Sequence, residues 1–223
     1  MSDVPELRVE QVEPSPRRTR AARDRLRRAP RDFRGCGGSK GDSTTIGYAE
    51  ADDVAAAIAF ARRTFPNRSL VLYGQSMGAA AVLRAVAVKG VAADAIIVES
   101  PFDRLLTTVE HRFDAMGLPS FPLARLLVFW GGVQHGYWGF GHNPAEYAKA
   151  VRLPVLVMHG TTDARVATRD ATAIYDNLAG PKQLELFDGA AHLAFVEFDR
   201  DRWASVVSRF LAQHAPQEPV GGR

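Results

Sequence analysis

The chain contains little cysteine and no long apolar run. Its 223 residues include a single cysteine, Cys36, so no disulfide can form within the chain. No stretch approaches the roughly 20 apolar residues that a membrane-spanning helix needs, because Arg84 and Arg125 interrupt the best candidates. The N-terminus is charged and proline-rich and therefore lacks the apolar core of a secretory signal. These absences predict a cytoplasmic protein without a membrane span.

The sequence also lacks a metal-binding pattern. His135 and His142 stand in a stretch rich in glycine and aromatic residues, and nothing there has the spacing of metal ligands. Cys36 has no histidine close to it in sequence, and a loop cysteine of this kind is inert by default. We therefore expect neither a metal ion nor another cofactor.

Excess positive charge is missing everywhere except at the N-terminus. Residues 1–34 hold ten arginines and six acidic residues, whereas the whole chain has a net charge of only +3. The run RRTRAARDRLRRAPR at 17–31 could be an arginine-rich arm for nucleic acid or an anionic surface. It has no interleaved aromatic residues and no recognition motif. Residues 1–31 are therefore predicted to be a disordered segment, and nucleic acid is not expected as a partner.

The clearest positive signal lies at residues 69–88, which read SLVLYGQSMGAAAVLRAVAV. Residues 70–73 form an apolar run typical of a buried parallel strand, and apolar residues recur at helical spacing from Ser76 onward. A serine thus stands at a strand-to-helix bend between Gly74 and Gly78, which is the arrangement of a nucleophile elbow. The bend exposes the Ser76 hydroxyl and directs the Met77 N–H toward a developing oxyanion. The alternative is a serine in a tight packing turn.

Strands alternate with helices along the rest of the chain. This pattern predicts one α/β domain over residues 32–214, with a mainly parallel sheet and helices on both faces, followed by a frayed tail at 215–223. Further strands are expected at 95–98, 153–159 and 183–187, and helices near 48–64, 167–178 and 201–212. In such a fold, ligands bind beyond the carboxyl ends of the strands.

Residues 116–143 break this alternation and predict a small lid. The stretch is rich in glycine, proline and aromatic residues, and it separates two expected strands. Trp130, Trp138 and Phe140 are its candidate substrate-binding residues, because apolar walls suit an acyl or aromatic group. The alternative is a helical insertion that packs on the core.

Three residues with matching chemistry follow three expected strands. Ser76, Asp163 and His192 each lie at a carboxyl end, where the strands of a parallel sheet bring their loops together. A serine hydroxyl becomes a good nucleophile when an imidazole takes its proton and a carboxylate orients that imidazole. Asp163 could instead cap a turn, and His192 could be an ordinary loop histidine. Asp103, also beyond a strand end, is the reserve candidate for the acid.

These pieces resemble the α/β-hydrolase superfamily, in particular its serine aminopeptidase-like and monoglyceride lipase-like branch, from residue 32 to about 214. The matching motifs are DFRGCGGS at 32–39, GQSMG at 74–78, LPVLVMHGTTD at 153–163 and GAAH at 189–192. The resemblance implies that Ser76 is the nucleophile, His192 the general base and Asp163 the group that orients His192. It also implies that the Met77 N–H belongs to the oxyanion hole.

The segment before Asp32 departs from that family. A strand with a following His-Gly loop, which supplies the second oxyanion donor, is not legible there, and the only His-Gly pairs begin at His135 and His159. We therefore expect an N-terminally incomplete sheet, with the strand at 70–73 unpaired along one edge. A replaced segment, through a frameshift or a wrong start, is the corresponding hypothesis.

Two functions from different classes follow from these observations. The first is a serine hydrolase of carboxylic esters, with thioesters or peptides as alternatives, acting on a small-molecule acyl substrate. The second is a catalytically impaired relative, either with a binding role or as a truncated or frame-shifted gene product. The complete set of Ser76, Asp163 and His192 favours the first, and the missing His-Gly loop favours the second.

Overall fold

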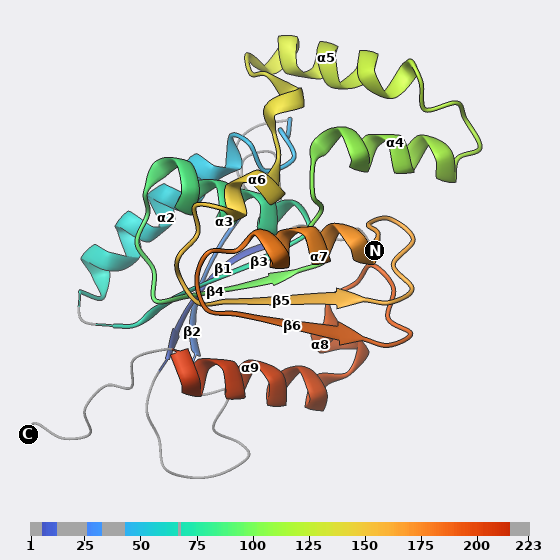
Figure 1. The fold of residues 1–223 in the computed structure, drawn as a ribbon. Helices are drawn as coiled ribbons and strands as arrows, with labels where there is room; N and C mark the ends of the chain where they lie inside the picture. Colours follow the sequence, from blue (N-terminus) through green and yellow to red (C-terminus); the bar gives the residue numbers. More distant parts are fainter. Residues whose placement is uncertain (1–5, 13–25, 33–42, 67, 215–223) are drawn as a thin grey trace, which may run out of the picture.

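A computed structural model describes residues 6–12, 26–32, 43–66 and 68–214. Its middle layer is a six-stranded sheet in the order β2-β1-β3-β4-β5-β6 (Figure 1). Strands β3 to β6 run parallel to one another, whereas β1 is antiparallel to both of its neighbours. The predicted fold class, a mainly parallel α/β sheet, is confirmed. The strands are β1 (Glu6–Val12), β2 (Leu26–Asp32), β3 (Leu70–Gln75), β4 (Ala95–Glu99), β5 (Val155–Gly160) and β6 (Lys182–Phe187).

Helices cover both faces of the sheet. On one face lie α2 (Glu50–Thr64), α3 (Met77–Lys89), α6 (Pro144–Ala148) and α7 (Thr168–Asn177). On the other face lie α8 (Phe195–Phe198) and α9 (Arg200–His214), drawn in red in Figure 1. The remaining helices, α4 (Leu105–Ala115), α5 (Leu123–His135) and the short 3-10 helix η1 (Gly139–Gly141), lie on the side of α3 and α6 away from the sheet.

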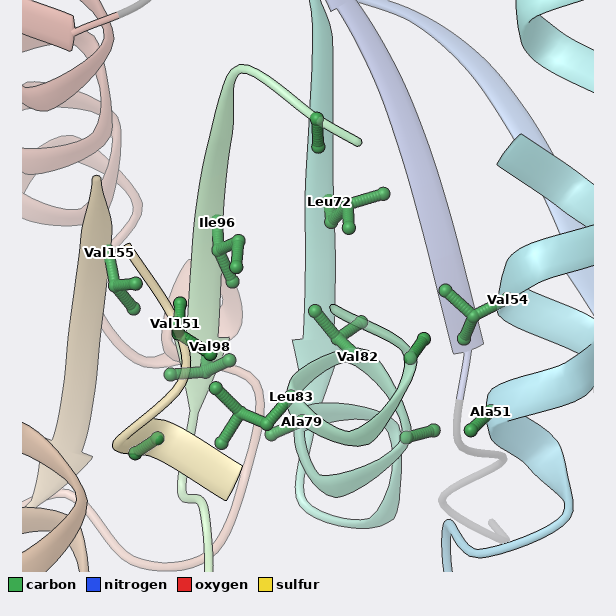
Figure 2. Packing of buried hydrophobic residues seen from close by; sticks show 14 of the residues in the cluster. Ala51, Val54, Leu72, Ala79, Val82, Leu83, Ile96, Val98, Val151 and Val155 are labelled. Atoms are coloured by element: carbon green, nitrogen blue, oxygen red, sulfur yellow. The ribbon is translucent and has the colours of Figure 1, made fainter. Parts of the chain in front are cut away.

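The two cores follow from the alternation of side chains along the strands. Because successive residues of a strand point to opposite faces, Leu72 and Ile96 pack with α2 and α3, as Figure 2 shows. Val71 and Ile97 pack with α8 and α9 on the other face. Every residue of β4 is buried, which explains why residues 95–98 form a continuous apolar run rather than an alternating one.

The edge of β3 is paired, which corrects the sequence-based expectation. Residues Leu7 to Gln11 of β1 pair with Leu70 to Gly74, and β2 pairs with the far side of β1. Residues 1–31 were predicted to be disordered, whereas 6–12 and 26–31 lie in the strands β1 and β2. The physical reason is that the strand beside an elbow strand need only offer backbone N–H and C=O groups, and an antiparallel segment offers them as well as a parallel one.

Other predictions fall outside the described residues. They concern Cys36, the glycine-rich loop after Asp32 and the tail at 215–223.

The lid segment consists largely of α5 and η1, and α5 packs on α4 and η1. Only Ala124, Val128 and Gly132 of α5 are buried, and its outward face carries exposed apolar residues such as Trp130. No helix in the described ranges combines the length and the apolar character needed to cross a membrane.

Gly180 supplies a test of how tightly the connection between α7 and β6 is packed. A Cβ at this position would overlap the backbone carbonyl of Arg152. Gly180→Ala is therefore expected to lower the free energy of unfolding by roughly 1–3 kcal/mol, the usual cost of overpacking. Urea denaturation of both proteins measures the difference.

The matched control for this prediction is Gly131→Ala. A Cβ there would meet nothing within 4 Å, and Gly131 lies within α5, where alanine is the better helix former. The control should be neutral or slightly stabilising. Equal losses in the two variants would contradict the steric explanation.

Candidate active site

Ser76 stands at the bend between β3 and α3. Its backbone has φ 51° and ψ −111°, a conformation that residues other than glycine rarely adopt. The Ser76 N–H donates to the carbonyl oxygen of Glu99 at 2.8 Å, which ties the bend to the end of β4. A Cβ at Gly74 would lie 2.5 Å from the Gly78 carbonyl, so the approach of strand and helix requires glycine at 74. The local fold thus holds a strained serine at the carboxyl end of β3.

The loop after β6 brings His192 to this serine. The Nε2 atom of His192 lies 3.1 Å from Ser76 Oγ, and its Nδ1 atom lies 2.7 Å from Asp163 Oδ2. An ionised carboxylate only accepts hydrogen bonds, so Nδ1–H is the donor to Asp163. In the neutral ring Nε2 is then the acceptor for the serine hydroxyl. The three side chains proposed from the sequence therefore form one continuous hydrogen-bonded chain.

Asp163 is held from two sides in the turn after β5. Its Oδ1 accepts the N–H of Arg165 at 2.8 Å and that of Val166 at 2.9 Å, while Oδ2 faces His192. Burial alone would raise the pKa of Asp163, but the hydrogen bonds from His192 and these two N–H groups outweigh it and hold the pKa below its usual value. The same residue thus caps a turn and meets the histidine.

Asp103, the reserve candidate for the acid, is engaged elsewhere. Its carboxylate accepts the N–H of Arg104 at 2.6 Å. It also lies near Asp170 at the start of α7, where burial and the negative charge of Asp103 raise the pKa of Asp170 to about 6. Arg169 and His111 flank this pair. Within the described ranges, no group of three or more His, Cys, Asp or Glu side chains could hold a metal ion.

Met77 begins α3 directly after the serine. The first N–H groups of a helix have no intrahelical acceptor, so the Met77 N–H is available to an anion at the bend. The loop before α2 packs on this residue: the Thr44 hydroxyl lies 3.0 Å from Met77 Sδ. A Cβ at Gly47, which has φ +99°, would come 2.8 Å from the Met77 carbonyl oxygen.

Glu50 holds that loop in place and was not anticipated from the sequence. Its fully buried carboxylate accepts hydrogen bonds from Thr44 Oγ1, from the N–H and hydroxyl of Thr45, and from the N–H of Gly47. Burial raises the pKa of Glu50, but these hydrogen bonds outweigh that effect and lower it. The pair of threonines a few residues before an acid at a helix start was the available signal.

The lid is bonded to the same loop. The Tyr137 hydroxyl donates to the Thr45 carbonyl at 3.3 Å, and His142 Nε2 lies 2.8 Å from the Ile46 carbonyl. His142 is fully buried. Its burial lowers the pKa of His142 to about 4, so the ring is neutral at pH 7 and Nε2–H donates to Ile46.

The aromatic lid residues named from the sequence occupy different environments. Trp138 lines a hollow of about 260 Å³. Phe140 packs against Trp138 with ring centroids 5.0 Å apart. Trp130 is as exposed as Trp138, but it packs against Phe129 and does not line the hollow. The complete lining of the hollow is Phe129, Gly132, Val133, Gly136, Tyr137 and Trp138. One of these residues, Tyr137, is hydrogen-bonded to the loop that packs on Met77.

Comparisons with known proteins agree with the fold. A model of the family described as serine aminopeptidase, S33, matches residues 29–124. An uncharacterized protein of Bacillus subtilis, YqkD, is 28% identical over 183 residues, which are 81% of this chain and 60% of that protein. The chain therefore spans less than two thirds of the length of this curated relative.

Solved structures show the same architecture. The Pyrococcus furiosus esterase Pf2001 is 24% identical with a TM-score of 0.66, over 86% of this chain and 71% of that one. A putative non-heme bromoperoxidase of Mycobacterium tuberculosis, BpoC, is 19% identical with a TM-score of 0.55, over 82% and 80% of the respective chains. At these identities the likeness concerns the fold alone.

His142 makes the stability of the protein depend on pH. Because its folded pKa of about 4 lies below its unfolded value of about 6.5, its contribution to stability is complete above pH 6.5 and is lost as the pH falls toward 4. Between pH 7 and pH 5 the wild type should lose about 2 kcal/mol that a His142→Gln variant does not lose. Urea denaturation at both pH values measures this.

The matched control is His135→Gln, which removes a histidine from the same segment. If both variants lost the pH dependence equally, the assignment to His142 would be wrong. The comparison uses the difference between pH values within each variant, so a uniform loss of stability in His142→Gln does not obscure the result.

Proposed function

We propose that this chain, which has the α/β-hydrolase fold and resembles the serine aminopeptidase branch of that superfamily, is a serine hydrolase of carboxylic esters. The observation that carries the proposal is the chain of contacts from Ser76 Oγ through His192 to Asp163, at 3.1 and 2.7 Å. A serine in this setting has a base within reach of its proton and a carboxylate that fixes the tautomer of that base.

The reaction would proceed in two halves. Ser76 Oγ attacks the ester carbonyl carbon while His192 Nε2 takes the hydroxyl proton, and the negative oxygen forms beside the Met77 N–H at the positive end of α3. The intermediate collapses as His192 returns the proton to the departing alcohol, which leaves an acyl group on Ser76. A water molecule, deprotonated by His192, then attacks the acyl-enzyme, and His192 returns the proton to Ser76 Oγ as the carboxylic acid is released.

Asp163 would supply electrostatic support throughout these steps. The lowered pKa of Asp163 keeps its carboxylate ionised near neutral pH, so it can stabilise the imidazolium that forms twice in each cycle. Thioesters and peptides present the same carbonyl to the same groups, and the geometry favours none of the three over the others. p-Nitrophenyl esters are the substrates to test first because their nitrophenolate leaving group needs little help from a general acid.

A fluorophosphonate probe and p-nitrophenyl acetate test the proposal. The wild type should react with the probe and hydrolyse the ester, and Ser76→Ala should lose labelling and at least about 10⁴-fold in kcat/KM. The matched control is Ser205→Ala, on the exposed side of α9, which should keep both activities. A wild-type protein that folds but neither labels nor hydrolyses the ester would favour the catalytically impaired alternative.

The lid hollow provides a prediction about chain length. Trp138→Ala removes part of the apolar lining of the hollow. The kcat/KM for octanoyl esters should therefore fall about tenfold relative to acetyl esters, which corresponds to the loss of about one to two kcal/mol of apolar contact. Trp130→Ala, an equal truncation outside the lining, is the matched comparison and should change the ratio less. Equal effects of Trp138→Ala on both esters would show that the hollow does not receive the acyl chain.

A further inference from the structure

Glu99 lies between the nucleophile and the base. It is the last residue of β4 and pairs in register with Gln75, the residue before Ser76. Its backbone carbonyl accepts the Ser76 N–H at 2.8 Å, so the main chain of Glu99 fixes one side of the strained bend. This contact follows from the parallel register and would form with any side chain at position 99.

The carboxylate of Glu99 reaches the other side of the site. Oε2 accepts the N–H of Phe195 at 3.3 Å, and Oε1 accepts the indole N–H of Trp203 at 2.6 Å. Phe195 begins α8 just after the loop that carries His192. The chain continues through Asp199 into α9. The N–H of Asp199 donates to the carbonyl oxygen of Phe195, and the N–H of Trp203 donates to the carbonyl oxygen of Asp199, both at 2.9 Å. The carboxylate therefore binds the His192 loop and the helix behind it together.

Packing alone does not explain a carboxylate at position 99. Ala95 and Ile97, which share a face of β4 with Glu99, pack in the apolar core beneath α9. Glu99 is 0% exposed, and a buried carboxylate costs several kcal/mol unless its oxygens are hydrogen-bonded. An apolar side chain would fill the same space without that cost. What the carboxylate adds is a fixed distance to two N–H donors beyond His192.

We propose that Glu99 is a positioning residue that sets the separation of Ser76 and His192, its carbonyl holding the serine bend and its carboxylate holding the histidine loop. The inference rests on the proposed function, because its consequence is a rate. Without the carboxylate, the loop after β6 loses its link to β4, and His192 Nε2 drifts from the 3.1 Å contact with Ser76 Oγ. Misplacement by about 1 Å can cost roughly 10²-fold in rate.

The experiment compares Glu99→Gln, Glu99→Leu and Trp203→Phe with the wild type. Glu99→Gln keeps the shape but only one accepting oxygen, Glu99→Leu keeps neither, and Trp203→Phe removes one donor while retaining an aromatic ring. For p-nitrophenyl acetate, kcat should fall about tenfold in Glu99→Gln and about 10²-fold in Glu99→Leu, with KM unchanged. In Trp203→Phe, kcat should fall less than in either Glu99 variant, since the N–H of Phe195 still holds the carboxylate.

Asp94→Asn is the matched control. Asp94 lies just before β4, at the opposite end from Glu99, and its carboxylate likewise accepts a backbone N–H of β3, that of Leu70 at 2.6 Å. The control should lower the melting temperature without lowering kcat at 25 °C. A loss of kcat in Asp94→Asn as large as that in Glu99→Gln, or Glu99 variants that fold and keep kcat within threefold, would overturn the proposal.

A second readout separates this inference from the proposed function. The Nδ1 proton of His192, which bonds to Asp163, should give a downfield proton NMR signal in the wild type and lose it or shift it in Glu99→Gln, but not in Asp94→Asn. An inactive wild type would refute the hydrolase proposal, and the NMR comparison would still decide the role of Glu99. If Glu99→Leu fails to fold, Glu99→Gln and Trp203→Phe carry the test; an unchanged signal and rate in both would refute it.

Discussion

The close approach of β3 and α3 at Gly74 and Gly78 is the contact on which the site depends. A Cβ at residue 74 would lie 2.5 Å from the backbone of Gly78, so only a glycine at 74 allows β3 and α3 to approach this closely. The resulting bend leaves Ser76 with φ 51°. Such a conformation costs about 1–3 kcal/mol and persists only where the surroundings impose it. The buried β3 strand, the Ser76 N–H bond to Glu99 and the packing of α3 together impose it.

The parallel sheet then converts sequence separation into proximity. Because β3, β4, β5 and β6 all point the same way, the loops that follow them meet at one edge. Asp163 and His192 come from the loops after β5 and β6, and those loops are bonded to each other: the N–H of Thr162 donates to the Ala190 carbonyl at 3.0 Å. The acid and the histidine are thus held as one unit, while the serine belongs to another. Besides the direct contact between Ser76 Oγ and His192 Nε2, Glu99 at the end of β4 contacts the serine bend and Phe195, which follows the His192 loop.

Local patterns predicted the features that local chemistry determines. The strands at 70–73, 95–98 and 153–159 were legible because a buried strand must be apolar, and the bend at Ser76 because its glycines are required. The antiparallel β1 was not predicted, since the arginine-rich composition of residues 1–34 concealed it and its partner β3 lies some sixty residues away. Glu50 and Glu99 were missed for a related reason: a buried carboxylate resembles a solvated one in sequence, and what distinguishes them is hydrogen-bond donors distant along the chain.

Glu50 and Glu99 hold two different segments that lie next to Ser76. Glu50 holds the loop at 44–47 against Met77, and the lid reaches that loop through Tyr137 and His142. Glu99 holds the bend and the His192 loop from the other side of the sheet. A displacement of α5 and η1 would therefore first move the loop that packs on Met77, and would reach the contact between Ser76 Oγ and His192 Nε2 only indirectly. The proposed reaction would consequently depend on two separate sets of hydrogen bonds, one that joins residues 137–142 to the loop before α2 and one that joins Ser76, His192 and Glu99 to their partners, so a change in one need not disturb the other.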